Sequence, residues 1–211
     1  MNTPIPDPHL RTPFVQGGMY HAHPGIAHLC AVIRSGELGP LRHITSWFGF
    51  VATQENGGAI AQVGGYPLSL AMLLAGTNAG NDWAQPENLR CFRRESESGA
   101  DLLSLAHLRF AGGLTADLSC AVDTDWDMGV NLTFAEGLIR VTDPFWPEGG
   151  AMHIQTLSMA APPKNQVVRA TGDCHAWADP AQTLAVARWL EAWHTQACDA
   201  ADTFVLPPVH P

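Results

Sequence analysis

This chain of 211 residues contains a tyrosine that directly follows two glycines, and the type and position of this residue could do chemistry. Gly64 and Gly65 let the backbone come close to a ligand, and the phenol of Tyr66 could donate a proton or a hydrogen bond to a ligand oxygen. A phenol with a pKa of about 10 is a poor base at neutral pH, so we expect Tyr66 to act as a donor. The amide of Gln62 could hydrogen-bond a hydroxyl group of the same ligand. A tyrosine that caps a packed helix is the alternative for Tyr66.

Two histidines, His21 and His23, are the next candidates for chemistry. A neutral imidazole can take or give a proton near pH 7, so either residue could act as base or acid. The His-x-His spacing also occurs in metal sites, but two ligands do not complete a zinc shell, and no suitable cysteine or carboxylate lies nearby in the sequence. We therefore predict no metal site. An ordinary hydrogen-bonded pair at the edge of a domain is the alternative to an acid–base role.

A third group of candidates is aromatic, and it begins in the stretch that holds Trp47. Trp47 could contact a ligand or face a second copy of the chain, whereas packing in the core is the alternative for most of these rings. The other members of the group are Phe48, Phe50, Trp126, Phe145 and Trp146.

Composition and charge exclude several classes of protein. Hydrophobic residues make up 46% of the chain and charged residues 15%, which excludes a disordered chain and allows a sizeable core. The net charge of −9 opposes binding to a phosphate backbone, so we predict no nucleic-acid partner. No apolar run reaches the roughly 18 residues of a membrane span, and the N-terminus has no signal-peptide pattern, so we predict no membrane partner. The five cysteines are far apart and form no CxxC pair, which favours reduced thiols in a cytoplasmic protein.

The elements that must position these candidates follow from periodicity and turn residues. Residues 1–18 carry four prolines and no apolar periodicity, so we interpret them as an extended arm. Apolar residues at helical spacing predict a helix over residues 24–35. A long strand is expected over residues 41–52, and a glycine-rich turn then leads into an apolar helix that ends at Gly76.

The second half of the chain is dominated by strand-like runs. A final helix begins at Asp179-Pro180, which match its N-cap and first helical position. The order of elements predicts one α+β domain over residues 19–211, with a large, mainly antiparallel open sheet built as a meander and helices packed on one face. The strand-like runs are NLRCFRRE, LLSLAHLRF, LTADLSCAV, VNLTF, LIRVTD, MHIQTLSM and NQVVRA.

Three stretches, taken together and in order, resemble the C-terminal domain of the Gfo/Idh/MocA family of NAD(P)-dependent oxidoreductases. The first is MYHAHPGIAHLCAVIRSGELGPLRHI, and the second is GGAIAQVGGYPLSLAMLLAG, which is most similar to the branch of dihydrodiol and xylose dehydrogenases. The third joins LRFAGGLTADLSC to FAEGLIRVTDPF. Together they cover nearly all of residues 19–197.

The resemblance implies a domain that forms part of a substrate pocket and dimerises through the open face of its sheet. It implies a sugar-like substrate or a cyclic polyol or hydroxy-ketone. The family's glycine-rich helix begins Asp-x-Gly-x-His or Asp-x-Gly-x-Tyr, so Tyr66 matches the last position and Gln62 replaces the Asp. The candidate catalytic residues are then Tyr66, His21 and His23, and the candidate substrate-binding residues are Gln62, Gly65 and Trp47.

The same resemblance implies that the nicotinamide cofactor is bound elsewhere. Family members bind NAD(P) through a Rossmann domain placed before this one, whereas eighteen residues precede Met19 here and no glycine pair forms the GxGxxG fingerprint. We expect this chain alone to bind no NAD(P), and a separate Rossmann-domain protein would be a partner. Family members also use a lysine from the Rossmann half, and the single lysine of this chain, Lys164, lies in an unrelated loop.

Two functions from different classes are compatible with these residues. The chain is expected to be the substrate-binding and oligomerising half of a sugar or polyol oxidoreductase. Alternatively it is a cofactor-free lyase or isomerase in which Tyr66 is the donor and His21 or His23 the base, a reading favoured by an N-terminal arm that looks like a genuine chain start. A non-catalytic scaffold that dimerises with full-length relatives is a further possibility.

Overall fold

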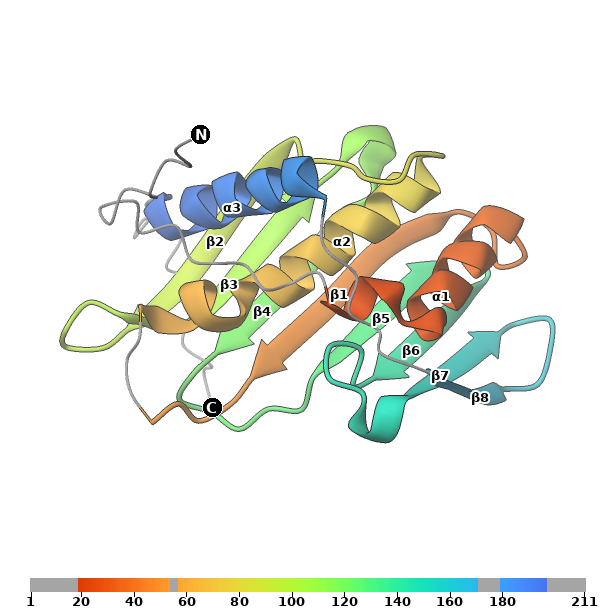
Figure 1. The fold of residues 1–211 in the computed structure, drawn as a ribbon. Helices are drawn as coiled ribbons and strands as arrows, with labels where there is room; N and C mark the ends of the chain where they lie inside the picture. The colour runs from red at the N-terminus through yellow and green to blue at the C-terminus, as the bar shows by residue number, and fades with distance from the viewer. Residues whose placement is uncertain (1–18, 54–56, 171–178, 197–211) are drawn as a thin grey trace, which may run out of the picture.

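A computed structural model of the chain describes residues 19–53, 57–170 and 179–196, and in them one large sheet carries helices on one of its faces (Figure 1). The predicted arm over residues 1–18 lies outside the described residues. The α+β class, the open sheet and its mainly antiparallel pairing are confirmed.

The described sheet has eight strands in the order β2-β3-β4-β1-β5-β6-β7-β8. The predicted meander is wrong in one respect, because β1 inserts between β4 and β5 and pairs parallel with β4, whereas every other neighbouring pair is antiparallel. The strands are β1 (Leu41–Gly49), β2 (Asn88–Glu95), β3 (Asp101–Arg109), β4 (Thr115–Ala121), β5 (Gly129–Phe134), β6 (Gly137–Thr142), β7 (Ala151–Ser158) and β8 (Lys164–Arg169).

The central strand β1 alternates as its sequence predicts. Ile44, Ser46 and Phe48 are buried on the face that the helices cover. Trp47 lies between them in sequence and therefore points to the opposite, open face. The two faces of β1 thus carry different candidates.

The first helix, α1 (Pro24–Ser35), has the bounds that the sequence predicts. Pro24 occupies the first turn, where its missing N–H group costs nothing. Gly36 ends the helix with a φ of 68°, a left-handed conformation that favours glycine.

The glycine-rich stretch before the second helix is itself helical, which the sequence did not predict. A wide π-helical turn (Ile60–Gly64) runs without a break into α2 (Gly65–Asn78). The carboxylate of Asp101 on β3 accepts a hydrogen bond of 2.7 Å from the Ile60 backbone N–H at the start of this helix. This tertiary cap stabilises a helix start that the glycines alone disfavour.

The end of α2 also lies beyond its predicted position. Gly76 does not stop the helix, because the backbone of Trp83 folds back against it, and a Cβ atom at Gly76 would lie 2.4 Å from the Trp83 Cα. The glycine is therefore needed for a close approach of two chain segments and not for a turn.

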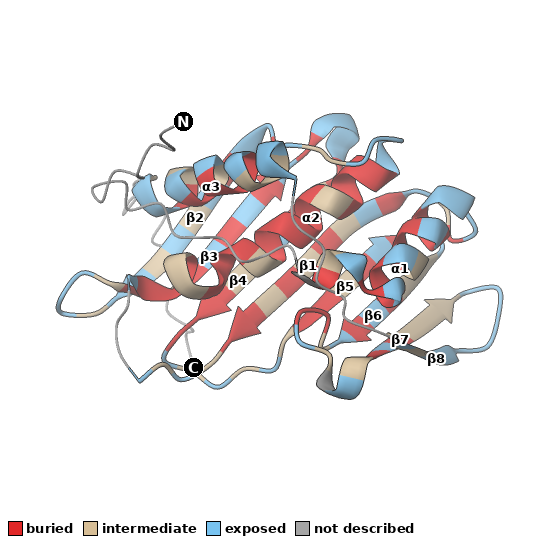
Figure 2. Cartoon of the chain, in the orientation of Figure 1, coloured by how far each residue is buried: buried red, intermediate tan, exposed pale blue. Residues whose placement is uncertain are grey.

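The helix over Ile60–Asn78 is buried on most sides, between the sheet and its neighbouring helices (Figure 2). Its 19 residues are long and apolar enough to cross a membrane by length and composition alone, but 78% of the apolar window is buried inside the protein. A core helix has this character, so the helix is weak evidence for a membrane span.

The last helix, α3 (Pro180–Thr195), begins as the sequence predicts. Asp179 is its N-cap and accepts a hydrogen bond of 2.7 Å from the Ala181 N–H. Near its other end Trp193 is fully buried, and its indole Nε1 donates to the Ser104 Oγ of β3 at 2.8 Å.

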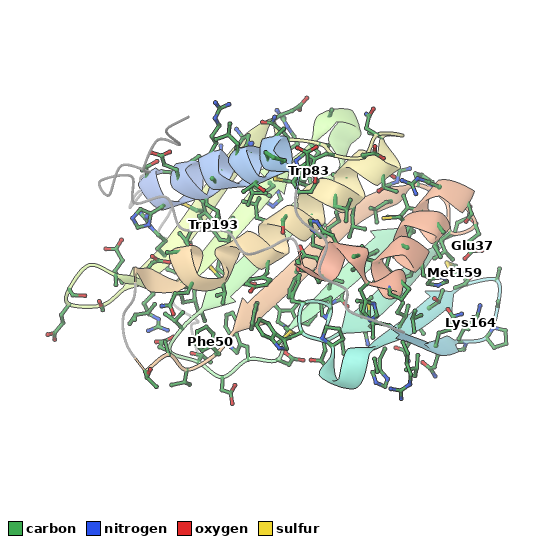
Figure 3. All side chains as sticks on the ribbon, in the orientation of Figure 1. Glu37, Phe50, Trp83, Met159, Lys164 and Trp193 are labelled. Carbon is green, nitrogen blue, oxygen red and sulfur yellow. The ribbon has the colours of Figure 1, made fainter. Side chains whose placement is uncertain are left out.

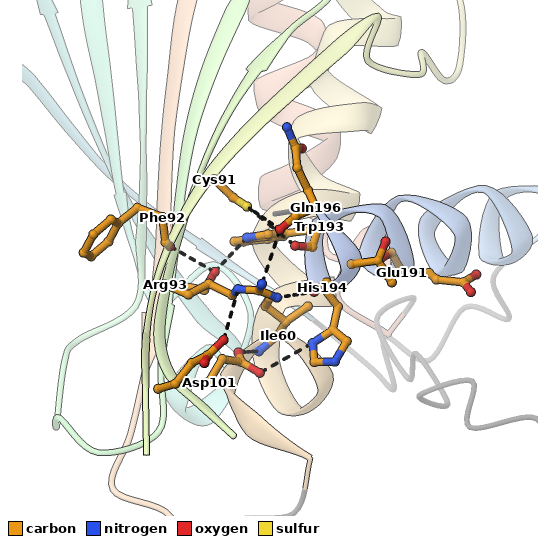
Figure 4. Close-up of polar contacts among 12 residues, drawn as sticks. Ile60, Cys91, Phe92, Arg93, Asp101, Glu191, Trp193, His194 and Gln196 are labelled. Carbon is orange, nitrogen blue, oxygen red and sulfur yellow. Dashed lines mark hydrogen bonds and ion pairs between the residues drawn. The ribbon is translucent and has the colours of Figure 1, made fainter. Parts of the chain in front are cut away.

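The C-terminal end of α3 is held by the edge strand β2 (Figure 4). The Arg93 guanidinium donates to the backbone carbonyls of His194 and Gln196, and the Cys91 thiol lies within 3.7 Å of the Trp193 carbonyl. A cation at a helix C-terminus satisfies carbonyl groups that have no partner within the helix. These contacts fix α3 on the same face of the sheet as α2.

Candidate functional site

Seven rings from five segments form a continuous cluster, which we call the ring cluster. Tyr20 is stacked with Tyr66 at 6.2 Å between centroids and meets Phe145 edge-on at 5.1 Å. At one end His21 lies 4.5 Å from Tyr20 and 6.0 Å from Trp83. The other two members are Phe48 and Phe50, and Figure 3 labels Trp83 and Phe50 at the two ends of the cluster.

Each segment of the ring cluster is positioned by an element of the fold. Tyr20 and His21 lie on the 3-10 turn η1 (Met19–Ala22), and Tyr66 lies in the first turn of α2. Phe48 lies near the end of β1 on the helix-covered face, Trp83 follows α2, and Phe145 lies in the loop after β6. The turn η1, the helix α2, the strand β1 and the loops beside them therefore bring together residues up to 125 positions apart.

Tyr66 is half-buried among these rings. Burial raises the pKa of its phenol, and no hydrogen bond among the described residues involves its hydroxyl group. The phenol therefore keeps its proton at neutral pH, and its O–H group is available to donate a hydrogen bond to a ligand. This geometry suits the donor role that the sequence predicts.

Tyr20 holds the backbone on which Tyr66 sits, and sequence reasoning missed it. Its buried hydroxyl lies 2.6 Å from the Ser69 Oγ and 3.0 Å from the Tyr66 carbonyl oxygen, and Ser69 in turn donates to the Gly65 carbonyl at 2.7 Å. Burial raises the pKa of Tyr20 far above its ordinary value, so it is a permanent donor. The available sequence signal was its position beside His21.

His21 lies within the ring cluster. Burial lowers the pKa of its imidazole to about 4, so the ring is neutral at neutral pH. Its Nε2 atom is buried and has no hydrogen-bond partner among the described residues. The Nε1 of Trp83, the neighbouring ring, is in the same state.

His23 is placed differently, although it is two residues away. It is buried, its Nδ1 accepts from the Gly25 N–H at 3.0 Å, and its Nε2 lies 3.0 Å from the Gly150 carbonyl oxygen. Because a carbonyl only accepts, the Nε2 carries the hydrogen. Both nitrogens are thus occupied in capping α1 and tying it to the loop before β7. The catalytic role of His23 stays a prediction, and the structure gives it no nitrogen with which to act.

The three predicted substrate-binding residues separate into two groups. Gln62 is half-buried one turn before Tyr66, with a buried Nε2 that lacks a partner in the described part of the chain, and Gly65 is buried beside it. Trp47 lies on the open face, where its Nε1 donates to the Asp127 Oδ1 at 2.9 Å and its ring packs on Gly129. The structure therefore does not bring Trp47 to the ring cluster, because neighbouring residues of a strand point to opposite faces.

The glycine-rich turn before α2 lacks the features of a phosphate-binding turn. A phosphate-binding turn needs unoccupied backbone N–H groups at a helix N-terminus. In the glycine-rich turn before α2 the Ile60 N–H is bonded to the Asp101 carboxylate, and a Cβ on Gly58 would lie 2.1 Å from the Asp101 Oδ1. A negative charge already sits where a phosphate would bind.

Metal binding gains no support from the described residues. Within residues 19–53, 57–170 and 179–196, no group of three or more His, Cys, Asp or Glu side chains is placed to hold a metal ion.

Comparisons with known proteins find sequences and structures that are similar to this chain. A scan of protein-family models gives no match. The chain is 24% identical over 131 residues to trans-1,2-dihydrobenzene-1,2-diol dehydrogenase from Bos taurus, and equally to that from Sus scrofa, covering 58% of this chain and 37% of each relative. The chain thus matches well under half of the length of these curated relatives.

Solved structures share the fold. An aldose-aldose oxidoreductase from Caulobacter crescentus superposes with a TM-score of 0.72 at 16% identity, covering 84% of this chain and 59% of that one. A mutant of KijD10, a 3-ketoreductase from Actinomadura kijaniata, superposes with a TM-score of 0.70 at 18% identity over the same shares. The chain therefore has the fold of the C-terminal sheet domain of Gfo/Idh/MocA-type oxidoreductases, as its motifs indicated, and its sequence is similar to that of the dihydrodiol dehydrogenases.

Proposed function

We propose that this chain is the substrate-binding and oligomerising domain of an oxidoreductase that acts on a sugar-like substrate or on a cyclic polyol or hydroxy-ketone. The observation that carries the proposal is Tyr66, whose protonated phenol stands in the ring cluster with no partner among the described residues. Similarity to a dihydrobenzenediol dehydrogenase supports a substrate that combines a ring with hydroxyl groups.

The residues of the ring cluster suit such a substrate. Aromatic rings pack well against the apolar face of a six-membered ring, and a few polar groups then fix its orientation. Tyr66 donates a hydrogen bond to a hydroxyl or carbonyl oxygen of the substrate, and the amide of Gln62 holds a second oxygen. Tyr20 acts through the backbone and keeps Tyr66 in place.

NAD(P) would be bound outside the described residues, by a further domain or by a separate Rossmann-domain protein. The Asp101 carboxylate at the glycine-rich turn supports this proposal, since it opposes a phosphate at that helix start. The residues of this chain would bind and orient the reacting carbon, and the redox step itself would belong to that other part.

The cofactor-free lyase or isomerase is less well supported. It needs a base beside the substrate, and the two histidines are its candidates. Burial lowers the pKa of His21 to about 4, which makes it a weak base, and both nitrogens of His23 are occupied. The structure thus favours the role of a binding domain over that of an acid–base enzyme.

We further propose that two copies of the chain associate through the open face of the sheet. Phe92 on β2 is paired in register with Leu105 on β3, and these side chains are 60% and 40% exposed. Ser119 on β4 and Trp47 on β1 continue the same row. A row that places three large apolar side chains and one serine across four strands is typical of a surface that a partner covers.

A cytoplasmic location is proposed on the cysteines. Cys30 and Cys120 are buried free thiols in the described part of the chain, as in proteins of a reducing compartment.

The function is tested by ligand binding to the purified chain and to its Tyr66→Phe variant. Calorimetry with trans-cyclohexane-1,2-diol should give saturable binding that weakens about three- to tenfold in the variant, which is the usual loss for one hydrogen bond. NADP⁺ alone should not bind at micromolar concentration. Equal affinity of the two proteins for the diol, or tight NADP⁺ binding, would contradict the proposal.

A further inference from the structure

Two ring nitrogens at one end of the ring cluster are buried without a hydrogen-bond partner among the described residues. They are the Nε2 of His21 and the Nε1 of Trp83. Buried polar atoms are hydrogen-bonded in the great majority of native proteins. Two such atoms in neighbouring rings therefore indicate a partner that the described residues do not supply.

The rings of His21 and Trp83 are direct neighbours in the ring cluster. Their centroids are 6.0 Å apart and their planes meet at 61°, and no hydrogen bond joins them directly. Two hydrogen bonds of about 2.9 Å that meet at one oxygen span up to about 5.8 Å between nitrogens. A shared oxygen atom therefore requires the two nitrogens to lie within this span of each other.

The backbone around both residues is held in place, so the arrangement is preorganised. The Trp83 backbone packs against Gly76 of α2, and the next residue, Ala84, donates to the Met72 carbonyl at 3.0 Å. His21 is fixed on η1, where the His23 N–H donates to the Tyr20 carbonyl at 2.9 Å. A rigid pair of polar groups binds a ligand with little loss of conformational entropy.

The chemistry of the two nitrogens defines the group that they would bind. An indole N–H only donates, so the bound atom must accept a hydrogen bond. A neutral imidazole nitrogen accepts or donates according to its tautomer, and burial keeps the His21 ring neutral at neutral pH. An alcohol oxygen satisfies Trp83 and either tautomer of His21, whereas an anion would have to enter an apolar cluster on a chain of net charge −9.

We propose that His21 and Trp83 together hold one hydroxyl group of the substrate, as positioning residues joined to Tyr66 through the ring of Tyr20. This inference rests on the proposed function and names a second contact point for the same polyol. Substrate selection would follow from it, because a ligand with hydrogen in place of the hydroxyl leaves both buried nitrogens unpaired, and an ether oxygen, which cannot donate, leaves the His21 Nε2 unpaired in the tautomer in which this nitrogen accepts.

The test uses the chain labelled with ¹⁵N at its indole nitrogens, with trans-cyclohexane-1,2-diol as the probe. The resonance of Trp83 is assigned by its loss in Trp83→Phe. We expect this resonance to move in a saturable way on titration, while that of Trp193, whose Nε1 is already bonded to Ser104, stays fixed. The His21→Phe variant should weaken the response about three- to tenfold, and trans-1,2-dimethoxycyclohexane should give a smaller response than the diol.

The outcomes separate this inference from the proposed function. A Trp83 response that persists in Tyr66→Phe supports the hydroxyl site independently of Tyr66. Binding of the diol that depends on Tyr66 but leaves the Trp83 resonance unchanged overturns the hydroxyl site and leaves the proposed function standing. A Trp83 resonance that already reports a hydrogen bond to an ordered water only, and does not respond to the diol, also overturns it.

Discussion

The hydrogen bond between Trp193 and Ser104 should carry a measurable part of the stability of the fold. Trp193 on α3 and Ser104 on β3 are each fully buried, and the indole Nε1 donates to the hydroxyl at 2.8 Å. Ser104 has a second contact, a longer bond of 3.4 Å to the Phe92 carbonyl, whereas the indole N–H has this one partner among the printed hydrogen bonds of the described residues. Removal of the Ser104 hydroxyl and removal of the Trp193 N–H should therefore lower the stability by different amounts.

The expected free energies follow from this asymmetry. Ser104→Ala strands a buried N–H group and should lower the free energy of unfolding by about 1–3 kcal/mol. Trp193→Phe removes the donor and part of a buried ring, and should cost about 1.5–2.5 kcal/mol through the lost bond and the lost apolar contact. In the Trp193→Phe background no donor is left to strand, so Ser104→Ala should then cost less than about 1 kcal/mol. The double-mutant cycle should give a coupling of about 1–2 kcal/mol.

The assay is denaturant unfolding of the four proteins, followed by far-ultraviolet circular dichroism. The midpoints should shift while the slope stays constant, since the surface exposed on unfolding hardly changes. Trp189→Phe is a matched control, because its Nε1 bonds the exposed Gln85 side chain at 3.3 Å and should cost less than about 1 kcal/mol. Additive effects in the cycle, or an unchanged midpoint for Ser104→Ala, would refute the reasoning.

Three further predictions concern α2 and the residues that hold it. Gly76→Ala should destabilise the protein by about 1–3 kcal/mol in thermal or denaturant unfolding, because its Cβ would meet the Trp83 backbone at 2.4 Å; an unchanged stability would show that the two segments can separate freely. Burial raises the pKa of Asp101, so the folded state binds the proton of this carboxyl group more tightly than the unfolded state does. The free energy of unfolding should therefore fall as pH rises through the raised pKa, and Asp101→Asn should lack this dependence. Parallel profiles of stability against pH for the two proteins from pH 4 to 7 would contradict the prediction. Tyr20→Phe should cost about 0.5–1.5 kcal/mol and speed amide exchange in the first turn of α2, since it removes the bond to Ser69; unchanged exchange would exclude Tyr20 as the support of Tyr66.

The elements that the sequence predicts well are those with local signals. The bounds of α1 follow from apolar spacing and from a glycine cap, and α3 begins at an Asp-Pro pair that forms its N-cap. The glycine-rich stretch before α2 predicts a turn and is helical in the structure, because its cap comes from Asp101, about forty residues later in the chain. Gly76 predicts a helix end, but the helix continues to Asn78, and the residue that requires the glycine, Trp83, lies outside the helix.

The site shows the same division between local and distant information. Tyr66 and His21 could be selected from residue type and neighbours, and the structure places both in the ring cluster. Phe145 could be selected only as one of several aromatic candidates, and Trp83 could not be selected at all, because nothing in its own segment indicates that it lies beside His21. Strand alternation separates Trp47 from Phe48, and the structure places Trp47 on the open face of the sheet, away from the ring cluster.

The position of β1 has a consequence for how the chain reaches this structure. This strand precedes both of its partners in the chain, because β4 and β5 lie some seventy to ninety residues downstream. In the described sheet it is the sole strand that joins strands β2 to β4 to strands β5 to β8. During synthesis on a ribosome, the backbone N–H and C=O groups at both edges of β1 have no partner strand until β4 and β5 emerge. Closure of such long loops is slow, so we expect late, rate-limiting assembly at this strand and a need for protection of its edges until then.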